Sequence, residues 1–313
     1  MFKKLFCAWC AIANSTLLNI EWPDGNSQYY GTILNSSNFG IKGYYPKSRY
    51  FSFELYSIDT WEPFWSVYDK QIQTDNNPYK YDIEYADNLS YNLYIDANYS
   101  SNFILLYRIY MGIDLYGGVD LPIIEVNSKE LVQCNQSSRP VIDIQDSEPD
   151  YVLYEQNKNN NFYPPVTKKK LFINANARYM IAYYNESSFN YAKITTKLPT
   201  IPINMSSKIY QTRYFSFSTV DLSEPKQTIQ TISDKELLSE SDYLTLYVYC
   251  INKRDLVIHL TPPANNSKSC LSIFGILYRQ LLPQFKYEIP NNRLSQNNLM
   301  KVMDEYYPLI EWY

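Results

Sequence analysis

Arginine could do the most specific chemistry in this chain, because it recurs in the same setting twice. The pentapeptide Arg-Tyr-Phe-Ser-Phe occurs at Arg49–Phe53 and again at Arg213–Phe217. A guanidinium can bind a carboxylate, a phosphate or a sulfate through paired hydrogen bonds. In an extended strand each arginine would share a face with two phenylalanines, and a charge in apolar surroundings has to be paired. We therefore expect either a buried ion pair at each position or an arginine that binds an anionic ligand.

The chain offers a carboxylate for each of these arginines. Asp69 follows the first pentapeptide and Asp234 follows the second at almost the same distance, and a lysine comes next in both cases. We predict that Arg49 pairs with Asp69 and that Arg213 pairs with Asp234. Recurrence in both halves favours a structural ion pair over a ligand site, since duplicated binding sites usually diverge.

Two more arginines lie inside apolar runs, in the pairs Tyr107-Arg108 and Tyr278-Arg279. The same argument applies to them, because an unpaired guanidinium among aliphatic side chains is strongly destabilising. We predict that Arg108 and Arg279 also form structural ion pairs.

The residues needed for most catalytic chemistry are missing. The single histidine, His259, lies in an apolar strand-like run and is expected at a core edge. One histidine excludes a His-rich zinc or copper site, and a Ser-His-Asp triad would need His259 as its base. There is no Gly-rich phosphate loop, and the acidic cluster Asp143–Asp150 lacks the glycine and ligand register of a calcium loop. We predict no catalytic residue, no metal site and no cofactor.

An aromatic group between the first pentapeptide and Asp69 is the best candidate for ligand binding. It consists of Trp61, Phe64, Trp65 and Tyr68. On a loop, Trp61, Trp65 and Tyr68 could form a platform that stacks against a sugar. The alternative, which we favour, is that these rings close one end of a sandwich, because large aromatic side chains are usually buried.

Composition limits the choice of partner. The chain has 313 residues, of which 45% are hydrophobic and 17% aromatic, with 33 tyrosines. Abundant tyrosine, asparagine, isoleucine and lysine are typical of an AT-rich genome, such as that of a protist or a large DNA virus; a tyrosine-rich sugar-binding surface is the other interpretation. A net charge of −4 argues against a nucleic-acid partner, which requires a basic surface. No stretch is long and apolar enough to predict a transmembrane span.

The N-terminus allows two interpretations. Lys3-Lys4 precedes the apolar stretch Leu5–Ala13, and Ala11-Ile12-Ala13 resembles a signal-peptidase site, which favours a secreted or virion-associated protein over a cytoplasmic one. The alternative is an N-terminal segment that packs on the first domain. The five cysteines have no framework spacing and do not decide the compartment.

The repeat and the strand patterns predict the organisation of the chain. We expect a mainly β protein of two tandem antiparallel β-sandwich, jelly-roll-like modules that arose by internal duplication, with few short helices. The predicted parts are residues 1–20 (signal or N-terminal segment), 21–126 (first module), 127–170 (linker or insertion) and 171–313 (second module). Strands are expected at Tyr50–Tyr56, Ser90–Ala97, Phe103–Tyr110, Pro122–Val126, Tyr191–Lys197, Arg213–Val220, Tyr243–Ile251 and Ile273–Leu281. Phe103–Tyr110 is expected to be a central strand, and helices are expected at Asn174–Tyr184 and Asn298–Tyr306.

These motifs resemble a family of uncharacterised, mostly bacterial proteins, many of which carry signal peptides. The segments that match the family pattern are Tyr45–Tyr56, Tyr107–Tyr110, Asp114–Pro122, Lys197–Pro202, Arg213–Ser216 and Tyr278–Phe285. The resemblance implies a tandem β-sandwich fold and an exported ancestor, and it brings no established activity. Family members often carry paired cysteines and a Trp-Pro motif in the second half. Neither is found here, so the resemblance does not imply a stabilising disulfide.

Three functions remain open. We favour a non-enzymatic protein with a structural or interaction role that is secreted, at a surface or in a particle, with a protein or glycan partner and an oligomer as an open alternative. The second is a carbohydrate- or small-anion-binding module. The third is a hydrolase that uses two carboxylates from the set Glu54, Asp59, Glu62 and Asp69.

Overall fold

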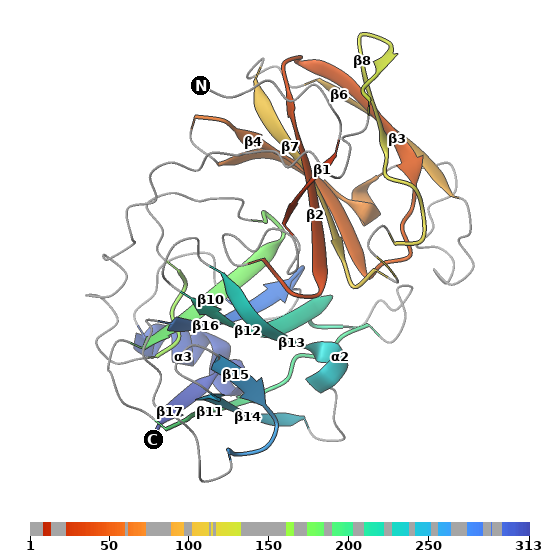
Figure 1. The fold of residues 1–313 in the computed structure, drawn as a ribbon. Coiled ribbons are helices and arrows are strands. Elements are labelled where there is room, and N and C mark those ends of the chain that lie inside the picture. The colour runs from red at the N-terminus through yellow and green to blue at the C-terminus, as the bar shows by residue number, and fades with distance from the viewer. Residues whose placement is uncertain are drawn as a thin grey trace.

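The computed structural model describes the chain as two β-rich modules stacked on one another (Figure 1). The described residues are 9–13, 23–59, 62–72, 89–96, 102–112, 114, 117–132, 161–165, 174–184, 190–202, 210–221, 227–237, 242–251, 256–263, 274–283, 289 and 296–313. They form four antiparallel sheets and few short helices, so the predicted mainly β fold is confirmed.

The first module is a sandwich of two sheets. One sheet has, in spatial order, β1 (Cys10–Ala13), β2 (Ser27–Leu34), β7 (Phe103–Tyr110), β4 (Tyr50–Ser57) and β5 (Pro63–Tyr68). The other has β6 (Ser90–Asp96), β3 (Asn38–Tyr44), β8 (Ile123–Val126) and β9 (Lys129–Glu130). The strand predicted to be central, β7, lies in the middle of its sheet, as its unbroken apolar run indicates.

The second module repeats this plan. Its first sheet has β10 (Ala177–Tyr184), β16 (Phe274–Leu281), β12 (Tyr214–Asp221) and β13 (Thr228–Ser233). Its second sheet has β15 (Leu256–His259), β14 (Tyr243–Cys250), β11 (Ala192–Lys197) and β17 (Leu309–Trp312). The helices are η1 (Asp69–Gln71), α2 (Asp234–Leu237), α3 (Gln296–Met303) and η4 (Asp304–Tyr306).

The repeated motifs occupy equivalent places in the two cores. In the first module the ring of Phe53 stacks on Tyr107 with 4.8 Å between the ring centroids. In the second module Phe217 stacks on Tyr278 at 4.5 Å. Each pair joins the pentapeptide strand to the Tyr-Arg strand beside it, so the pattern of the sequence repeat sets the same strand register twice.

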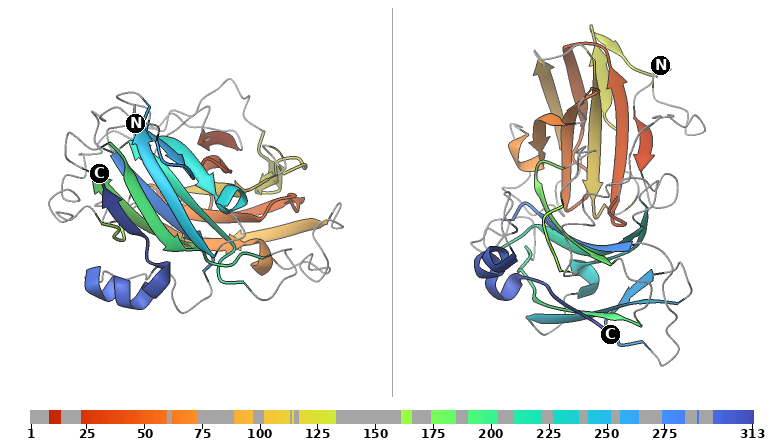
Figure 2. Two further views of the ribbon diagram at one scale, coloured as in Figure 1. Left: turned by 90° about the horizontal axis from the view of Figure 1, so that it is seen from below. Right: turned by 90° about the vertical axis from the view of Figure 1, so that its left-hand side faces the viewer.

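The pentapeptide strand β4 is buried on both faces, whereas its alternation predicts a half-buried strand. Phe51 and Phe53 face the sandwich core, and Tyr50 joins a second cluster with Tyr110 and Tyr214. Tyr214 belongs to the second module, so Tyr50, at the start of β4 on its outward face, is buried against the other module. In Figure 2 the sheet that contains β10, β16 and β12 is the layer of the second module nearest the first.

The strand predictions agree with the structure to within one residue at each end. The predicted helix Asn174–Tyr184 is wrong, because Ala177–Tyr184 is strand β10 and pairs along its whole length with β16. Local helix propensity is weaker than eight residues of sheet pairing with buried contacts on both sides. The predicted closing helix is present as α3 followed by η4.

Residues at the predicted ends of the modules take part in the cores. Trp9 is buried against Phe53 and Tyr107, and β1 pairs with β2. Phe162, in the predicted linker, is buried in the core of the second module, and Tyr307 donates a 2.8 Å hydrogen bond to its carbonyl oxygen. The acidic cluster Asp143–Asp150 lies outside the described residues.

Candidate functional site: a polar layer between the modules

The repeated arginines exchange their partners across the boundary between the modules. Arg49 Nη1 donates to Asp234 Oδ2 at 2.5 Å, and Arg213 Nη1 donates to Asp69 Oδ1 at 2.6 Å. The predicted pairs Arg49–Asp69 and Arg213–Asp234 are therefore wrong in their partners. A sequence repeat shows which residues are equivalent, but it does not show whether equivalent residues contact within one copy or between two copies.

Each aspartate is positioned by its own module. Asp69 opens η1, and its Oδ2 accepts a hydrogen bond of 3.3 Å from the backbone N–H of Phe51. Asp234 opens α2, and its Oδ2 accepts from the backbone N–H of Phe215 at 3.4 Å. The carboxylate is thus fixed beside the strand that follows its own arginine, and it faces the arginine of the other module.

Burial changes the acidity of one of these aspartates. Asp234 is fully buried, and this raises the pKa of its carboxyl to about 6, although Arg49 acts in the opposite direction. The side chain of Arg49 remains 21% exposed, whereas Arg213 and Asp69 are both buried. The two reciprocal pairs therefore join equivalent residues, but they differ in their exposure to solvent.

The other two arginines are paired deeper in the same layer. Arg108 Nη1 lies 2.8 Å from Glu54 Oε2, and both residues belong to the first module. Arg279, by contrast, donates to Asp24, which comes from the first module while Arg279 comes from the second. Desolvation lowers the pKa of each arginine, but the neighbouring carboxylate and tyrosine hydroxyls together raise it by more, so both arginines remain charged.

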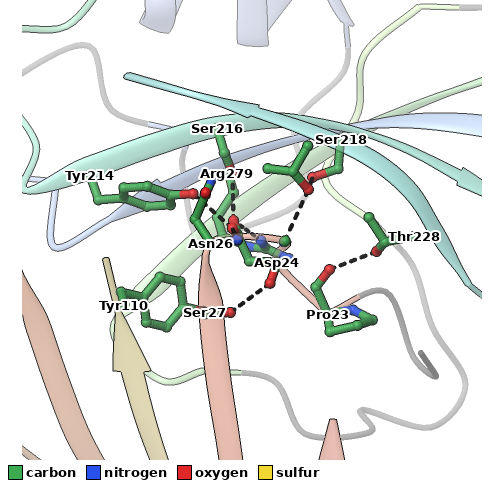
Figure 3. Close-up of polar contacts among 12 residues, drawn as sticks. Pro23, Asp24, Asn26, Ser27, Tyr110, Tyr214, Ser216, Ser218, Thr228 and Arg279 are labelled. Atoms are coloured by element: carbon green, nitrogen blue, oxygen red, sulfur yellow. Dashed lines mark hydrogen bonds and ion pairs between the residues drawn. The ribbon is translucent and has the colours of Figure 1, made fainter. Parts of the chain in front are cut away.

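Asp24 is buried at the centre of a set of contacts between the modules (Figure 3). Tyr214 donates to its Oδ1 and Ser216 to its Oδ2, each at 2.7 Å. Beside it, Thr228 donates to the carbonyl oxygen of Pro23 at 2.6 Å. Asp24 is not among the residues predicted from the sequence. The signal that could have found it is the match between Asp24-Gly-Asn-Ser-Gln-Tyr29 and Asn174-Ala-Asn-Ala-Arg-Tyr179.

Aromatic rings separate and cover these charges. The rings of Tyr110 and Tyr214 meet edge to face across the module boundary at 5.5 Å. The guanidinium of Arg213 lies 5.9 Å from the ring of Tyr50, in a cation–π arrangement. Burial raises the pKa of the Tyr50, Tyr110 and Tyr214 hydroxyls, so these tyrosines are neutral hydrogen-bonding groups and not proton carriers near neutral pH.

The predicted aromatic platform is only partly described. Trp65 and Tyr68 lie on β5, an edge strand, and Trp61 lies outside the described residues. Phe64 and Trp65 are half-buried against the first core. Tyr68 stacks on Tyr50 at the module boundary with 6.3 Å between centroids. The aromatic group therefore belongs to a strand and not to a free loop.

The proposed catalytic carboxylates are divided between two environments. Glu54 is held by Arg108 and by the hydroxyl of Tyr56, and Asp69 is held by Arg213. Asp59 and Glu62 are exposed. Burial against arginine removes Glu54 and Asp69 from contact with a substrate, so the set loses half of its acids.

The remaining candidates show no reactive grouping. His259 stacks on Tyr249 on the outer sheet of the second module, at 5.5 Å between ring centroids. Within the described ranges, no cluster of three or more His, Cys, Asp or Glu side chains could hold a metal ion. Among those same residues, the helices are too short or too polar to span a bilayer.

The outer sheets carry a second repeated feature. Tyr94 on β6 and Tyr247 on β14 occupy equivalent register positions, opposite Gly40 and Lys193 respectively. Tyr94 is 77% exposed. Tyr247 is half-buried, and its ring lies 6.0 Å from that of Tyr191. Both modules thus present tyrosine on the sheet that faces away from the polar layer.

No protein-family model and no curated protein matches this sequence, so the family resemblance stays a prediction. Among solved structures, an uncharacterised protein from Burkholderia cenocepacia matches with a TM-score of 0.58 at 9% identity, over 98% of this chain and 81% of that one. A protein from Vibrio parahaemolyticus matches at 10% identity with a TM-score of 0.43, over 94% of this chain and 90% of its own. The Burkholderia likeness spans both modules and shows the fold alone; the Vibrio likeness is too distant to carry an argument.

Proposed function

We propose that this protein is a non-enzymatic structural or interaction protein, in which two β-sandwich modules form one body. The observation that supports this proposal is the use of the buried charges. Four arginines lie in or beside the module boundary, and each is paired with a carboxylate of the chain itself: Asp234, Glu54, Asp69 and Asp24. Three of these four pairs join the two modules, and the fourth, Arg108–Glu54, lies within the first.

The outward faces then supply the contacts with a partner. Tyrosine combines a large apolar ring with a hydroxyl, a combination that is enriched at protein interfaces. Tyr44, Tyr94, Tyr243 and Tyr313 are exposed. A partner that binds both outer sheets would meet them at a fixed distance, because the polar layer between the modules fixes their relative position.

An oxidising compartment is part of the proposal. Cys250, at the end of β14, is disulfide-bonded, and its partner is not among the side chains that the structure describes. Structural disulfides form and persist in secreted proteins and on virion or cell surfaces, and they are rare in the cytosol. This supports a secreted, surface or particle-associated protein.

The test is native mass spectrometry of the protein purified from its own source, with quantification of the particles or envelopes that accompany it. The proposal expects stoichiometric amounts in such particles or in the secreted fraction, and a mass that includes at least one disulfide. An intracellular chain with free thiols and no stable partner would overturn it.

A carbohydrate- or small-anion-binding module is the second candidate. Its supporting observation is the position of Trp65, half-buried on the edge strand β5, where a ring can stack against a sugar. A glycan array would test it, with Trp65→Ala as the variant and Tyr94→Ala, on a different sheet, as the control. Loss of a specific signal in Trp65→Ala alone would favour this candidate. Absence of any glycan signal for the native protein would count against it.

A further inference from the structure

The ion pairs Arg279–Asp24 and Arg108–Glu54, here called the inner pairs, lie in two equivalent sets of residues at the module boundary, here called half-sites. The two half-sites differ in which module supplies the carboxylate. The Asp24 half-site joins Asp24 of the first module to Tyr214, Ser216 and Arg279 of the second. Ser218 belongs to the same half-site through Thr231, which it contacts by a hydrogen bond and whose Oγ1 accepts from the N–H of Gly25. In the Asn174 half-site, Oδ1 of Asn174 of the second module accepts from the hydroxyl of Tyr50 of the first. Beside it in the first module, Ser52 and Arg108 both contact the carboxylate of Glu54. Sheet register establishes the correspondence, because Arg108 lies opposite Tyr29 and Ser52, and Arg279 lies opposite Tyr179 and Ser216.

Asp24 and Asn174 have the same backbone role. Each carbonyl oxygen accepts from the N–H three residues later, at 3.1 Å from Ser27 and at 3.0 Å from Ala177. Each Oδ1 accepts from the N–H two residues later, at 2.9 Å from Asn26 and 2.8 Å from Asn176. The turn is therefore conserved between the halves, and the charge of its first residue is not.

A second difference compensates the first. Where the turn carries Asp24, the pentapeptide strand opposite it continues with Ser218; where the turn carries Asn174, that strand continues with Glu54. The Glu54 carboxylate also reaches the Asn174 turn, since the N–H of Ala175 lies 3.4 Å from its Oε2. Each half-site thus contains one guanidinium and one carboxylate, and the acid is supplied across the boundary in one and within the module in the other.

This arrangement balances only when unlike modules face one another. Two first modules would bring Asp24 and Glu54 together beside a single Arg108, so that each half-site would hold two buried carboxylates and one guanidinium. Two second modules would place Asn174 and Ser218 beside Arg279, so that each half-site would hold a buried guanidinium without an acid. Both states are unfavourable, because buried like charges repel and an uncompensated buried charge is strongly destabilising.

The pairs Arg49–Asp234 and Arg213–Asp69, here called the outer pairs, do not distinguish like modules from unlike modules. Arg49 and Arg213 are equivalent, as are Asp69 and Asp234, so an arginine would meet an aspartate in any combination of modules. The reciprocal contacts have the form of an interface in a two-fold symmetric dimer, in which the same surface binds its own copy. Selection between modules therefore depends on the inner half-sites.

We propose that Asp24 and Glu54 are specificity-determining residues that make the first module a partner for the second module and disfavour the pairing of like modules. Specificity of this kind needs an unfavourable wrong pair as well as a favourable right one. Here the pairing of like modules is disfavoured because the numbers of carboxylates and guanidiniums in each half-site would be unequal. The partner that this surface fits is the unlike module of the chain, not a second copy of the same module.

Two isosteric replacements in the full-length chain each reproduce one of the half-sites that two like modules would form. Asp24→Asn creates the half-site of two second modules, and Asn174→Asp creates that of two first modules. We expect each to lower Tm by roughly 5–10 °C. The loss in Asn174→Asp should be smaller at pH 5 than at pH 8, because adjacent carboxyls can share a proton at the lower pH.

Two double variants that keep the net charge of the chain distinguish two effects. One is the change in the number of carboxylates in a half-site, and the other is the loss of hydrogen bonds made by Asp24. D24N/S218E moves the acid from the turn to the strand, as in the Asn174 half-site, and should recover at least half of the loss of D24N. D24N/N174D moves the acid to the other half-site and should be less stable than either single variant. If D24N does not fold, recovery of folded protein in D24N/S218E is the supporting result.

The proposal is overturned if Asn174→Asp is as stable as the native chain at pH 8, because the half-site of two first modules would then carry no penalty. It is also overturned if D24N/S218E is no more stable than D24N, because Asp24 would then act through its contacts with Tyr214 and Ser216 and not through its charge.

Discussion

Arg213 of the second module donates to Asp69 of the first at 2.6 Å, and both side chains are buried. The two residues are separated by 144 positions in the sequence, and the repeat equivalent of each one's partner lies in its own half of the chain. The contact joins the modules through a charge that neither module neutralises alone, so each module depends on the other for the stability of its buried charges.

Breaking this pair should destabilise the whole chain. We expect Arg213→Met and Asp69→Asn each to lower the free energy of unfolding by about 3–5 kcal/mol, because each leaves an uncompensated buried charge or acceptor. The double variant should lose less than the sum of the two. Denaturant unfolding measures these values. Arg49→Met is the matched control, and its loss should be smaller, because Arg49 is 21% exposed and retains solvent around its charge. Equal losses for the two arginines would contradict the assigned difference in burial.

Asp234 should give the chain a distinctive pH dependence. Its folded-state pKa of about 6 lies above the ordinary value of 3.8 for an aspartate, so protonation favours the folded state. Its contribution to stability is fully present below pH 4 and is lost as the pH rises through 6. The stability of the native chain relative to Asp234→Asn should therefore fall by about 2 kcal/mol between pH 4 and pH 6.5. Urea unfolding of both proteins across that range measures the difference, and a difference that rises with pH would exclude this assignment.

Gly25 is predicted to be required for close approach of the modules. A Cβ atom at this position would lie 3.0 Å from both Cβ and Oγ1 of Thr231, in the other module. We expect Gly25→Ala to lower the free energy of unfolding by about 1–3 kcal/mol, because the overlap has to be relieved by moving one module. Gly40→Ala is the control, since its nearest neighbours would be 3.7 Å away, and it should be close to neutral. A neutral Gly25→Ala would show that the turn can move without loss.

The sequence places the eight strands that it predicts well, leaves others such as β2, β3 and β5 unpredicted, and predicts the contacts between modules poorly. Alternation in Tyr50–Tyr56 and the apolar run of Phe103–Tyr110 are local properties, and both strands were predicted to within one residue. The exchange of Arg49 and Arg213 between the aspartates is a property of three-dimensional packing. The same repeat is compatible with partners inside each module and with partners across the boundary, and only the packing of the two sheets selects between them.

Asp24 shows why part of the site escaped prediction. It is separated from Arg279 by 255 positions, and its equivalent in the second half is an asparagine, so a search for repeated charges passes over it. Strand β10 was missed for a related reason. Its alanine, arginine and methionine residues suit a helix locally, and the pairing with β16 that makes it a strand is formed with residues near the end of the chain.

The last prediction concerns the N-terminal segment. Trp9 is buried with its ring 5.5 Å from Tyr107 and 6.1 Å from Phe53, and its indole N–H donates to the carbonyl oxygen of Pro122. We expect Trp9→Ala to lower the free energy of unfolding by about 3–5 kcal/mol, because it leaves a cavity beside two stacked rings and an unpaired carbonyl. Trp65→Ala, at a half-buried ring on the edge strand, should be less destabilising. Thermal and denaturant unfolding of both variants would decide the matter. If Trp9→Ala were as stable as the native chain, the first core would be complete without β1, and a cleaved signal ending near Ala13 would be compatible with the fold.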